Sequence, residues 1–389
     1  MSRPTRRGAL VAYADGIDSP RSAPGEVLRA AGLAGRDPDV LVGWMPESRP
    51  WLASSTLHGR TTLAGYQLSD AVADGRLRYL PLRLSAVPRL VADLRPDVAV
   101  VTGVRRGSEL AFGMTAGWGP AAAVAAERVV VEIDEGGRDL GAPLIKGNIV
   151  ATLVRPAASA PAMMPRAPGP IDHEIAAHVL PLLPDDPTLQ LGPGGVAEAI
   201  IGALDRPVHI WSGLLTDALV ELDRRGLLIG RATAAYAWGG EPIADLADRG
   251  KVDLQPLDVT HDLTRLSGFD RFVGCNTALQ VGLDGSVNIE RVGGRLVAGI
   301  GGHADFCTSS SRSVGGLSII ALASTTRRGA STIVAAVETT STARSEVDVV
   351  VTEHGVADLR GVDDLERARR IAAIAAPQHR EALEARGDA

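Results

Sequence analysis

Several features that define other protein classes are scarce in this chain of 389 residues. Cysteine occurs only twice, at Cys275 and Cys307, which is too few for a disulfide framework and fits no redox or metal-binding spacing. No stretch of about 18 uninterrupted apolar residues occurs, so we expect no membrane span. The N-terminus has basic residues but no sustained apolar run, so we do not interpret it as a signal peptide and expect a cytoplasmic protein.

Excess positive charge and several familiar catalytic motifs are also missing. The formal net charge is -6 and the isoelectric point about 5.8, so nucleic acid is not an expected partner. HxH, HExxH and CxxC spacings are absent, so we expect no metal site. The chain also lacks a GxSxG nucleophile elbow, a Walker loop and the dinucleotide-binding GxGxxG pattern.

The chain is, by contrast, rich in aliphatic residues. Hydrophobic residues make up 45% of it and aromatic residues only 3%, so the core must consist mainly of Ala, Val, Leu and Ile. That composition suits buried parallel sheets covered by helices. At roughly 150 residues per domain, the length favours two or three domains.

Strand and helix patterns alternate along the first half of the chain. Short runs rich in β-branched residues predict strands at 39–44, 97–104, 128–134 and 148–154, and an Ala-rich helix is predicted at 119–127. This alternation predicts βαβ units and a parallel sheet. A Pro/Ala/Met stretch at 155–170 has the composition of a linker, and we predict two domains, 1–180 and 181–389.

The second half repeats this pattern. Strands are predicted at 188–192, 208–211, 317–325, 331–338 and 348–356, with helices at 196–204, 216–228 and 364–386. A Leu-Asp-Gly sequence between alternating runs predicts a hairpin near residue 284. The predicted fold class is therefore α/β, with two similar open domains of mainly parallel sheet.

Glycine is densest at AGIGGHADF (298–306), and SVGGLSIIAL (313–322) follows after a Ser/Thr run. Glycine-rich turns let backbone amides approach a phosphate or carbonyl oxygen of a ligand, although tight turns alone would explain them as well. His303 lies within the first cluster, His261 in a polar loop and His354 after a predicted strand. Each of these histidines, taken alone, is more often structural than catalytic.

Four segments near the C-terminus resemble the acetyl-CoA hydrolase/transferase family. They are the GIGGHADF turn, the SVGGLSIIAL strand, the TEHGVADLRG loop and the ending IAAIAAPQHREAL. Upstream, LQLGPGGVAEAI (189–200), CNTALQVGLDGSVNIE (275–290) and RYLPLRLSAVPRLV (78–91) are similar to family segments. The resemblance covers about residues 70 to 389 and is most specific in the last 120.

This resemblance implies a CoA-transferase fold and an acyl-CoA substrate. In the family, a glutamate carboxylate attacks the thioester, and a glutamyl-CoA intermediate passes CoA to an acceptor acid. It also implies that backbone amides at Gly301 and Gly302 stabilise oxyanions, and that Gly299 and Asn276 belong to the CoA site. Family members are often oligomeric, so we expect a homo-oligomer, most simply a dimer.

One departure concerns the residue that forms the covalent intermediate. The family segment resembling GIHTEMFSDGVVEL reads HIWSGLLTDALVEL here, so that Asp217 matches the family Asp and Ser212 the family Thr. Gly213 then occupies the position of the catalytic Glu, and glutamyl-CoA cannot form there. Glu241 is a candidate for a displaced carboxylate. Ser212 beside His209 is not expected to form a catalytic triad.

A second departure places imidazoles where the family has other groups. His261 falls in a loop where the family has an Asn, and His303 follows the glycine pair. Histidine can act as a general acid or base near neutral pH, so we take His261, His303 and Ser212 as catalytic candidates.

Three hypotheses for the function follow. The first is hydrolysis or carbon–carbon cleavage of an acyl-CoA without glutamyl-CoA. The second is an ordinary CoA-transferase with a displaced carboxylate, and the third is a non-catalytic CoA-binding or partner subunit. Trp118 and Trp238 could line an acyl pocket, although core packing is the commoner role of a Trp.

Overall fold

The computed structural model describes residues 8–156 and 167–387, and these divide into two compact units. The first unit takes the described residues up to 156 together with Thr233–Thr260 and Leu296–Gly301, and the second takes the remainder. The sequence predicted a single division at residue 180. In the structure, two later segments return to the first unit, and a linear strand–helix pattern contains no signal for such a return.

The first unit is built on a parallel sheet of strand order β4-β3-β2-β1-β5-β7-β8, with β6 antiparallel to β5. Its strands are β1 (Gly8–Tyr13), β2 (Asp37–Val42), β3 (Gly59–Thr61), β4 (Leu77–Tyr79), β5 (Val98–Arg106), β6 (Glu109–Ala111), β7 (Arg128–Asp134) and β8 (Ile149–Arg155). Its first four helices are α1 (Pro24–Ala30), α2 (Ser69–Ala73), α3 (Val87–Leu94) and α4 (Gly119–Ala125). The returning segment adds β12 (Ala232–Ala234), β13 (Tyr236–Trp238), α8 (Glu241–Asp248), β14 (Val252–Leu254) and α9 (Leu257–Thr260), and β19 (Arg295–Leu296) comes from the chain near residue 296.

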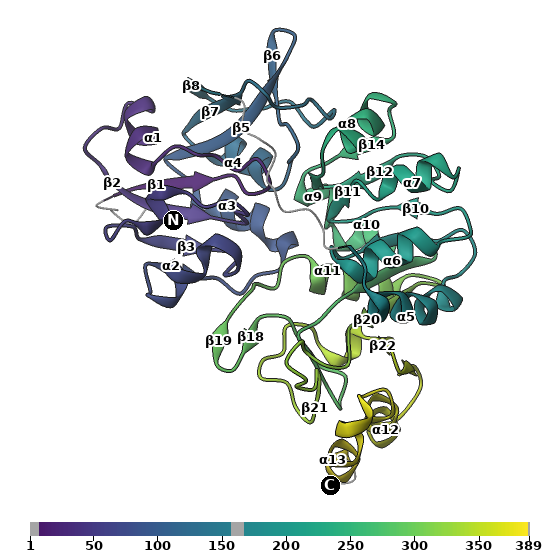
Figure 1. The fold of residues 1–389 in the computed structure, drawn as a ribbon. Coiled ribbons are helices and arrows are strands. Elements are labelled where there is room, and N and C mark those ends of the chain that lie inside the picture. Colours follow the sequence, from purple (N-terminus) through teal and green to yellow (C-terminus); the bar gives the residue numbers. More distant parts are fainter. Residues whose placement is uncertain (1–7, 157–166, 388–389) are drawn as a thin grey trace. The chain divides into compact units, whose positions relative to one another are not determined.

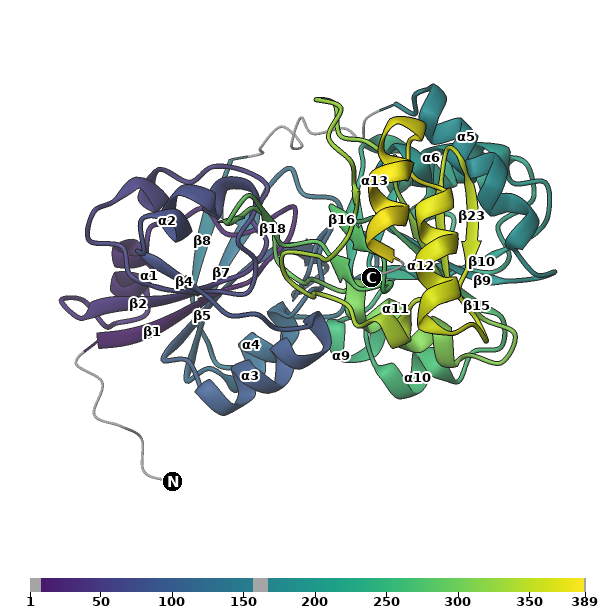
Figure 2. The ribbon, with the colours of Figure 1, turned by 90° about the horizontal axis from the view of Figure 1, so that it is seen from below.

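Helices cover both faces of this sheet. Figures 1 and 2 show α3 and α4 on one face and α1 on the other. The central strands β1, β5 and β7 are almost wholly buried, because Val- and Ala-rich strands between two helical layers meet apolar side chains on both sides. The predicted strands at 39–44, 97–104, 128–134 and 148–154 are all confirmed. The central strand β1 was not predicted.

The second unit contains a six-stranded sheet of order β10-β9-β15-β20-β22-β23, parallel except for its last pair. These strands are β9 (Thr188–Leu191), β10 (His209–Ile210), β15 (Phe272–Asn276), β20 (Leu317–Ala321), β22 (Val349–Thr352) and β23 (Gly355–Asp358). The shorter strands are β11 (Leu214–Thr216), β16 (Gln280–Gly282), β17 (Val287–Asn288), β18 (Arg291–Val292) and β21 (Ile333–Val334). The helices are α5 (Pro170–Val179), α6 (Gly195–Ala203), α7 (Leu219–Arg224), α10 (Leu263–Ser267), α11 (His303–Arg312), α12 (Asp364–Ala373) and α13 (Pro377–Gly387).

Several predicted elements differ from those in the structure. The helix predicted at 216–228 begins only at Leu219, because residues 214–216 form strand β11. The helix predicted at 364–386 is two helices, α12 and α13, since Pro377 lacks the amide hydrogen that would continue the first. The Ser/Thr run after the glycine cluster belongs to helix α11 and buries Ser309 and Ser310. The hairpin at β16 and β17 is confirmed.

Both sheets have a point where the strand order changes direction. In the first unit the chain builds outward from β1 to β4 and then adds β5 on the other side of β1; in the second it places β10 on one side of β9 and β15 on the other. Open α/β sheets bind ligands at the carboxyl ends of the strands beside such a point.

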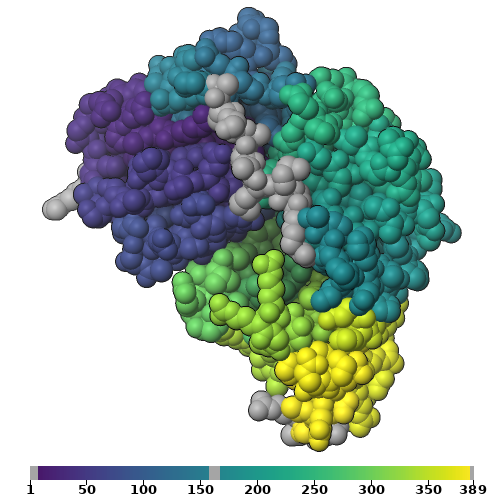
Figure 3. Space-filling view, viewed as in Figure 1, coloured from purple at the N-terminus to yellow at the C-terminus, as the bar shows by residue number. Residues whose placement is uncertain are grey.

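No helix within 8–156 and 167–387 is long and apolar enough to cross a membrane. Figure 3 shows α12 and α13 at the molecular surface.

Candidate active site

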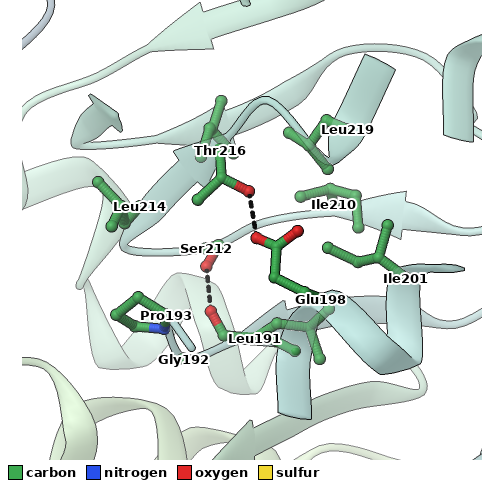
Figure 4. A pocket seen from close by; sticks show the side chains of 12 residues that line it. Leu191, Gly192, Pro193, Glu198, Ile201, Ile210, Ser212, Leu214, Thr216 and Leu219 are labelled. Carbon is green, nitrogen blue, oxygen red and sulfur yellow. Dashed lines mark hydrogen bonds between the residues drawn. The ribbon is translucent and has the colours of Figure 1, made fainter. Parts of the chain in front are cut away.

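The turn at Ser212–Gly213 connects β10 to β11 and has two different sides. Ser212 and Leu214 line a small cavity of about 30 Å³, which also holds the carboxylate of Glu198 (Figure 4). The Ser212 hydroxyl donates a 3.0 Å hydrogen bond to the Leu191 carbonyl oxygen, and the Thr216 hydroxyl donates one of 3.0 Å to Glu198. Ser212 is only 2% exposed, and its hydroxyl is committed to the backbone of the neighbouring strand.

Gly213 faces the other side of this turn. A Cβ placed on Gly213 would lie 3.4 Å from the Phe306 ring and 3.6 Å from Nε2 of His261. These are ordinary van der Waals distances, and the backbone of Gly213 is not left-handed. Neither the room for a Cβ nor the backbone conformation therefore requires glycine here, and a Cβ at this position would face the His261 imidazole.

His261 is buried between two glycines and an aromatic ring. It is 1% exposed, and its ring centroid lies 4.7 Å from that of Phe306. A Cβ on Gly302 would come within 2.5 Å of Nε2, so the imidazole fits only because residue 302 has no side chain. Burial lowers the pKa of His261 to about 3, and the ring is neutral at physiological pH.

His303 is the first residue of helix α11, and both of its ring nitrogens are hydrogen-bonded. Nε2 lies 3.1 Å from the Thr277 carbonyl oxygen and Nδ1 lies 2.9 Å from the Thr342 hydroxyl. A carbonyl oxygen only accepts, so Nε2 carries the proton and Nδ1 accepts from Thr342. Burial lowers the pKa of His303 to about 4. These contacts hold His303 as a neutral ring that links three segments of the second unit.

Asn276 ends strand β15 at the switch point of the second unit. Its amide exchanges two hydrogen bonds with Gln190 of β9, at 2.9 and 3.2 Å. The residue lines a cavity of about 280 Å³ formed by the ends of β9, β15 and β20 and by the Gly192–Gly195 turn. The cavity has an uncharged lining apart from Asp172.

The glycines predicted to bind CoA fall in different units. Gly299 and Gly301 belong to the first unit and Gly302 to the second. A Cβ on Gly299 would lie 3.1 Å from the backbone of Leu63, and Gly301 has a left-handed φ of 58°. The Gly301 carbonyl oxygen accepts a 3.0 Å hydrogen bond from the Leu84 amide. Close packing and turn geometry thus account for glycine at 299 and 301.

The first unit holds ionisable groups that the sequence reasoning missed. Asp15 and Asp18 follow β1, at its carboxyl end. The Tyr236 hydroxyl donates a 2.6 Å hydrogen bond to Asp15, and the Met114 amide donates one of 3.1 Å to Asp18. Loss of hydration raises the pKa of Asp15 to about 7 and that of Asp18 to about 6. The only sequence signal was a pair of aspartates three residues apart after an apolar run.

Glu241, the suggested replacement carboxylate, begins helix α8 in the first unit. Its carboxylate accepts a 2.8 Å hydrogen bond from Arg138, whose guanidinium also contacts Asp248 at 3.3 Å. Glu241 and Arg138 line another cavity, of about 330 Å³, together with Asp18 and Arg21. Glu241 is therefore a largely exposed member of an ion-pair network.

Comparison with known proteins identifies the fold class first. The crystal structure of a 4-hydroxybutyrate CoA-transferase from Porphyromonas gingivalis superposes with a TM-score of 0.78, at 24% identity, over 98% of this chain and 93% of that one. The two units thus form a CoA-transferase fold.

Sequence comparison then gives the family. The acetyl-CoA hydrolase/transferase C-terminal domain matches residues 242–386. A 4-hydroxybutyrate coenzyme A transferase of Clostridium kluyveri is 30% identical over 81% of this chain and 78% of its own length. A succinyl-CoA:cyclohexane-1-carboxylate CoA transferase of Geobacter metallireducens is 29% identical over 80% of this chain and 76% of its own length. The chain belongs to the acetyl-CoA hydrolase/transferase family, and it is an acyl-CoA enzyme of the hydrolase or transferase class.

Proposed function

We propose that this enzyme cleaves an acyl-CoA with water, by thioester hydrolysis or by hydrolytic carbon–carbon cleavage, and forms no glutamyl-CoA at the 213 turn. The observation that carries the proposal is the surroundings of Gly213. The position has room for a Cβ, carries none, and faces an imidazole. Where the family resemblance places a carboxylate nucleophile, the nearest ionisable side chain among the contacts of that Cβ is therefore His261.

His261 supplies the proton transfers in the hydrolytic version of this reaction. Water attacks the thioester carbonyl carbon while its proton passes to the neutral imidazole. The carbon–sulfur bond then breaks, and the imidazolium returns the proton to the departing thiolate. Because burial lowers the pKa of His261 to about 3, the imidazole is deprotonated throughout the physiological range, which is the form that accepts a proton. The amides at Gly301 and Gly302 and the Asn276 cavity are proposed to bind the substrate, with His303 and Ser212 as supporting groups.

A CoA-transferase with a displaced carboxylate is the second candidate. Glu198 favours it, because this half-buried carboxylate lines the cavity behind the same turn and burial raises its pKa. The geometry is less favourable, since Ser212 and Leu214 share a cavity with Glu198 whereas a Cβ on Gly213 would face His261.

Dependence on an acceptor acid tests the proposal. The purified protein is incubated with butyryl-CoA, acetyl-CoA and other acyl-CoA thioesters, with and without acetate or succinate, and release of the CoA thiol is measured. Acceptor-independent release supports water as the acceptor. Turnover that requires a second acid, with no thiol released in its absence, would instead establish transfer.

A Gly213→Glu variant sharpens the test. The Cβ of a Glu at this position would make only ordinary van der Waals contacts, so we expect the variant to gain acceptor-dependent CoA transfer. Gly213→Gln is the matched control, because it has the same size and no nucleophilic carboxylate.

A further inference from the structure

The first unit gathers a large share of the chain's aromatic side chains at one place. The sequence contains five Trp and four Tyr. Four of these nine, namely Trp44, Tyr66, Tyr236 and Trp238, form one cluster, which we call the aromatic cluster. The Trp44 ring lies 5.8 Å from Tyr66, 5.5 Å from Tyr236 and 5.6 Å from Trp238, each in an edge-to-face arrangement.

The cluster lies at the carboxyl edge of the first sheet. Trp44 comes two residues after the end of β2, and Tyr66 lies in the segment after β3. Asp15, just after β1, accepts a hydrogen bond from Tyr236 and so fixes that ring. Carboxyl edges beside a switch point are where open α/β sheets bind their ligands.

Two members of the cluster are not packed as core residues. Tyr66 is 44% exposed and Trp44 is half-buried, whereas Tyr236 and Trp238 are 5% and 7% exposed. Tyr66 also has a φ of 57°, which is unfavourable for an aromatic residue. Tyr66 is thus an exposed ring held at a backbone cost against Trp44, which in turn packs on two buried rings, and this arrangement indicates a recognition surface.

We propose that Trp44 and Tyr66 bind a ring-bearing acyl group, aromatic or alicyclic, of the CoA thioester. This rests on the proposed function only in taking acyl-CoA as the ligand. Edge-to-face and stacked contacts favour a flat or compact ring over a short linear chain, because a ring presents more area to two mutually inclined aromatic walls. Asp15, the carboxyl that contacts the cluster through Tyr236, is buried and accepts the hydrogen bond of that hydroxyl.

Two inert analogues test this inference by calorimetry. S-phenacyl-CoA and S-acetonyl-CoA carry a ketone in place of the thioester and differ only in a phenyl or methyl group, so neither is hydrolysed. The full chain is titrated with each as wild type, as Tyr66→Asn and as Trp44→Leu. Asn adopts left-handed backbone readily, so Tyr66→Asn removes the ring without adding strain. Trp51→Phe is the control, because Trp51 packs on Tyr13 in the core, 4.8 Å between ring centroids.

We expect the wild type and Trp51→Phe to bind the phenacyl compound about tenfold more tightly than the acetonyl compound. Tyr66→Asn and Trp44→Leu should reduce that ratio to within about twofold of unity. A ratio near unity in the wild type, or one unchanged in Tyr66→Asn, would overturn the inference while leaving acyl-CoA as the ligand. Failure of both analogues to bind the wild type would overturn the proposed function as well. Should Trp44→Leu not fold, the exposed position 66 decides alone.

Discussion

The two units bury ionisable groups of opposite kinds. Near the switch point of the first unit, burial raises the pKa of Asp15 to about 7. Around the candidate turn of the second unit, it lowers the pKa of His261 to about 3 and that of His303 to about 4. In both units burial favours the neutral form, since desolvation disfavours charge. The shift raises the pKa of the acid in one unit and lowers the pKa of the imidazoles in the other.

This difference gives the two units opposite responses to pH. An acid whose folded pKa is raised stabilises the fold below its unfolded pKa, and that contribution is lost as the pH rises through the folded value. A histidine whose folded pKa is lowered stabilises the fold above its unfolded pKa, and that contribution is lost as the pH falls. A rise in pH from about 4 to about 7 should therefore destabilise the first unit, and a fall in pH from 6.5 towards 3 should destabilise the second.

The largest expected effect is on catalysis. His261→Ala removes the proposed proton carrier and should lower kcat for acyl-CoA cleavage by about 10²- to 10⁴-fold. His209→Ala is the matched control, because His209 is a half-exposed histidine of the same unit, paired with Asp186 at 3.5 Å. Steady-state thiol release measures both, with circular dichroism as the check on folding. Unchanged turnover in His261→Ala would remove the imidazole from the mechanism.

Acid sensitivity of the second unit is the next effect in size. The ordinary pKa of histidine is 6.5, and that of folded His261 is about 3. As the pH falls between these two values, only the unfolded chain gains the proton, and the free energy of unfolding should decrease by roughly 5 kcal/mol. Hydrogen exchange in peptides from β9 and β15 should accelerate as the pH falls below 6.5. His261→Phe should remove most of this dependence. If the variant keeps the full acid dependence, burial of His261 is not its source.

The reverse behaviour is expected in the first unit. As the pH rises from 3.8, the ordinary pKa of Asp, to about 7, the pKa of buried Asp15, the free energy of unfolding should decrease by about 4 kcal/mol. Exchange in β1 and β5 peptides should therefore increase over this interval, and Asp15→Asn should flatten the profile while keeping an acceptor for Tyr236. Asp93→Asn is the control, since this carboxylate is 62% exposed on α3. Equal slopes in Asp15→Asn and wild type would contradict the assignment.

The smallest effect concerns the Asn276 cavity of the second unit. Asn276→Ala leaves the buried Gln190 amide without its two bonds and should lower the free energy of unfolding by about 1–3 kcal/mol. Replacing both residues by Leu should cost less than the single change, because no polar group is left unpaired. Thermal denaturation measures the loss of stability in Asn276→Ala and in the double Leu variant. A smaller loss in Asn276→Ala than in the double variant would show that the hydrogen-bonded pair is not important for stability.

The periodicity of the sequence anticipated most of the sheets. Runs such as 97–104 and 128–134 are recognisable because buried parallel strands are continuously apolar. The return of residues 233–260 to the first unit was not predictable, since the pairings that cause it are long-range. The sequence also singled out Gly213 and His261, but their contact depends on the absence of a side chain at Gly302, which only the structure reveals. Asp15 was missed because an isolated aspartate carries no mark of its burial.

Covalent trapping tests the central claim most directly. The wild-type protein is incubated with an acyl-CoA that it cleaves, treated with borohydride, which reduces a glutamyl-CoA thioester to the alcohol, and digested for mass spectrometry. The account predicts consumption of the thioester with every glutamate unmodified, and a reduced glutamate in Gly213→Glu alone. A reduced glutamate in the wild-type chain, at Glu198, Glu241 or elsewhere, would contradict it and establish an ordinary CoA-transferase mechanism.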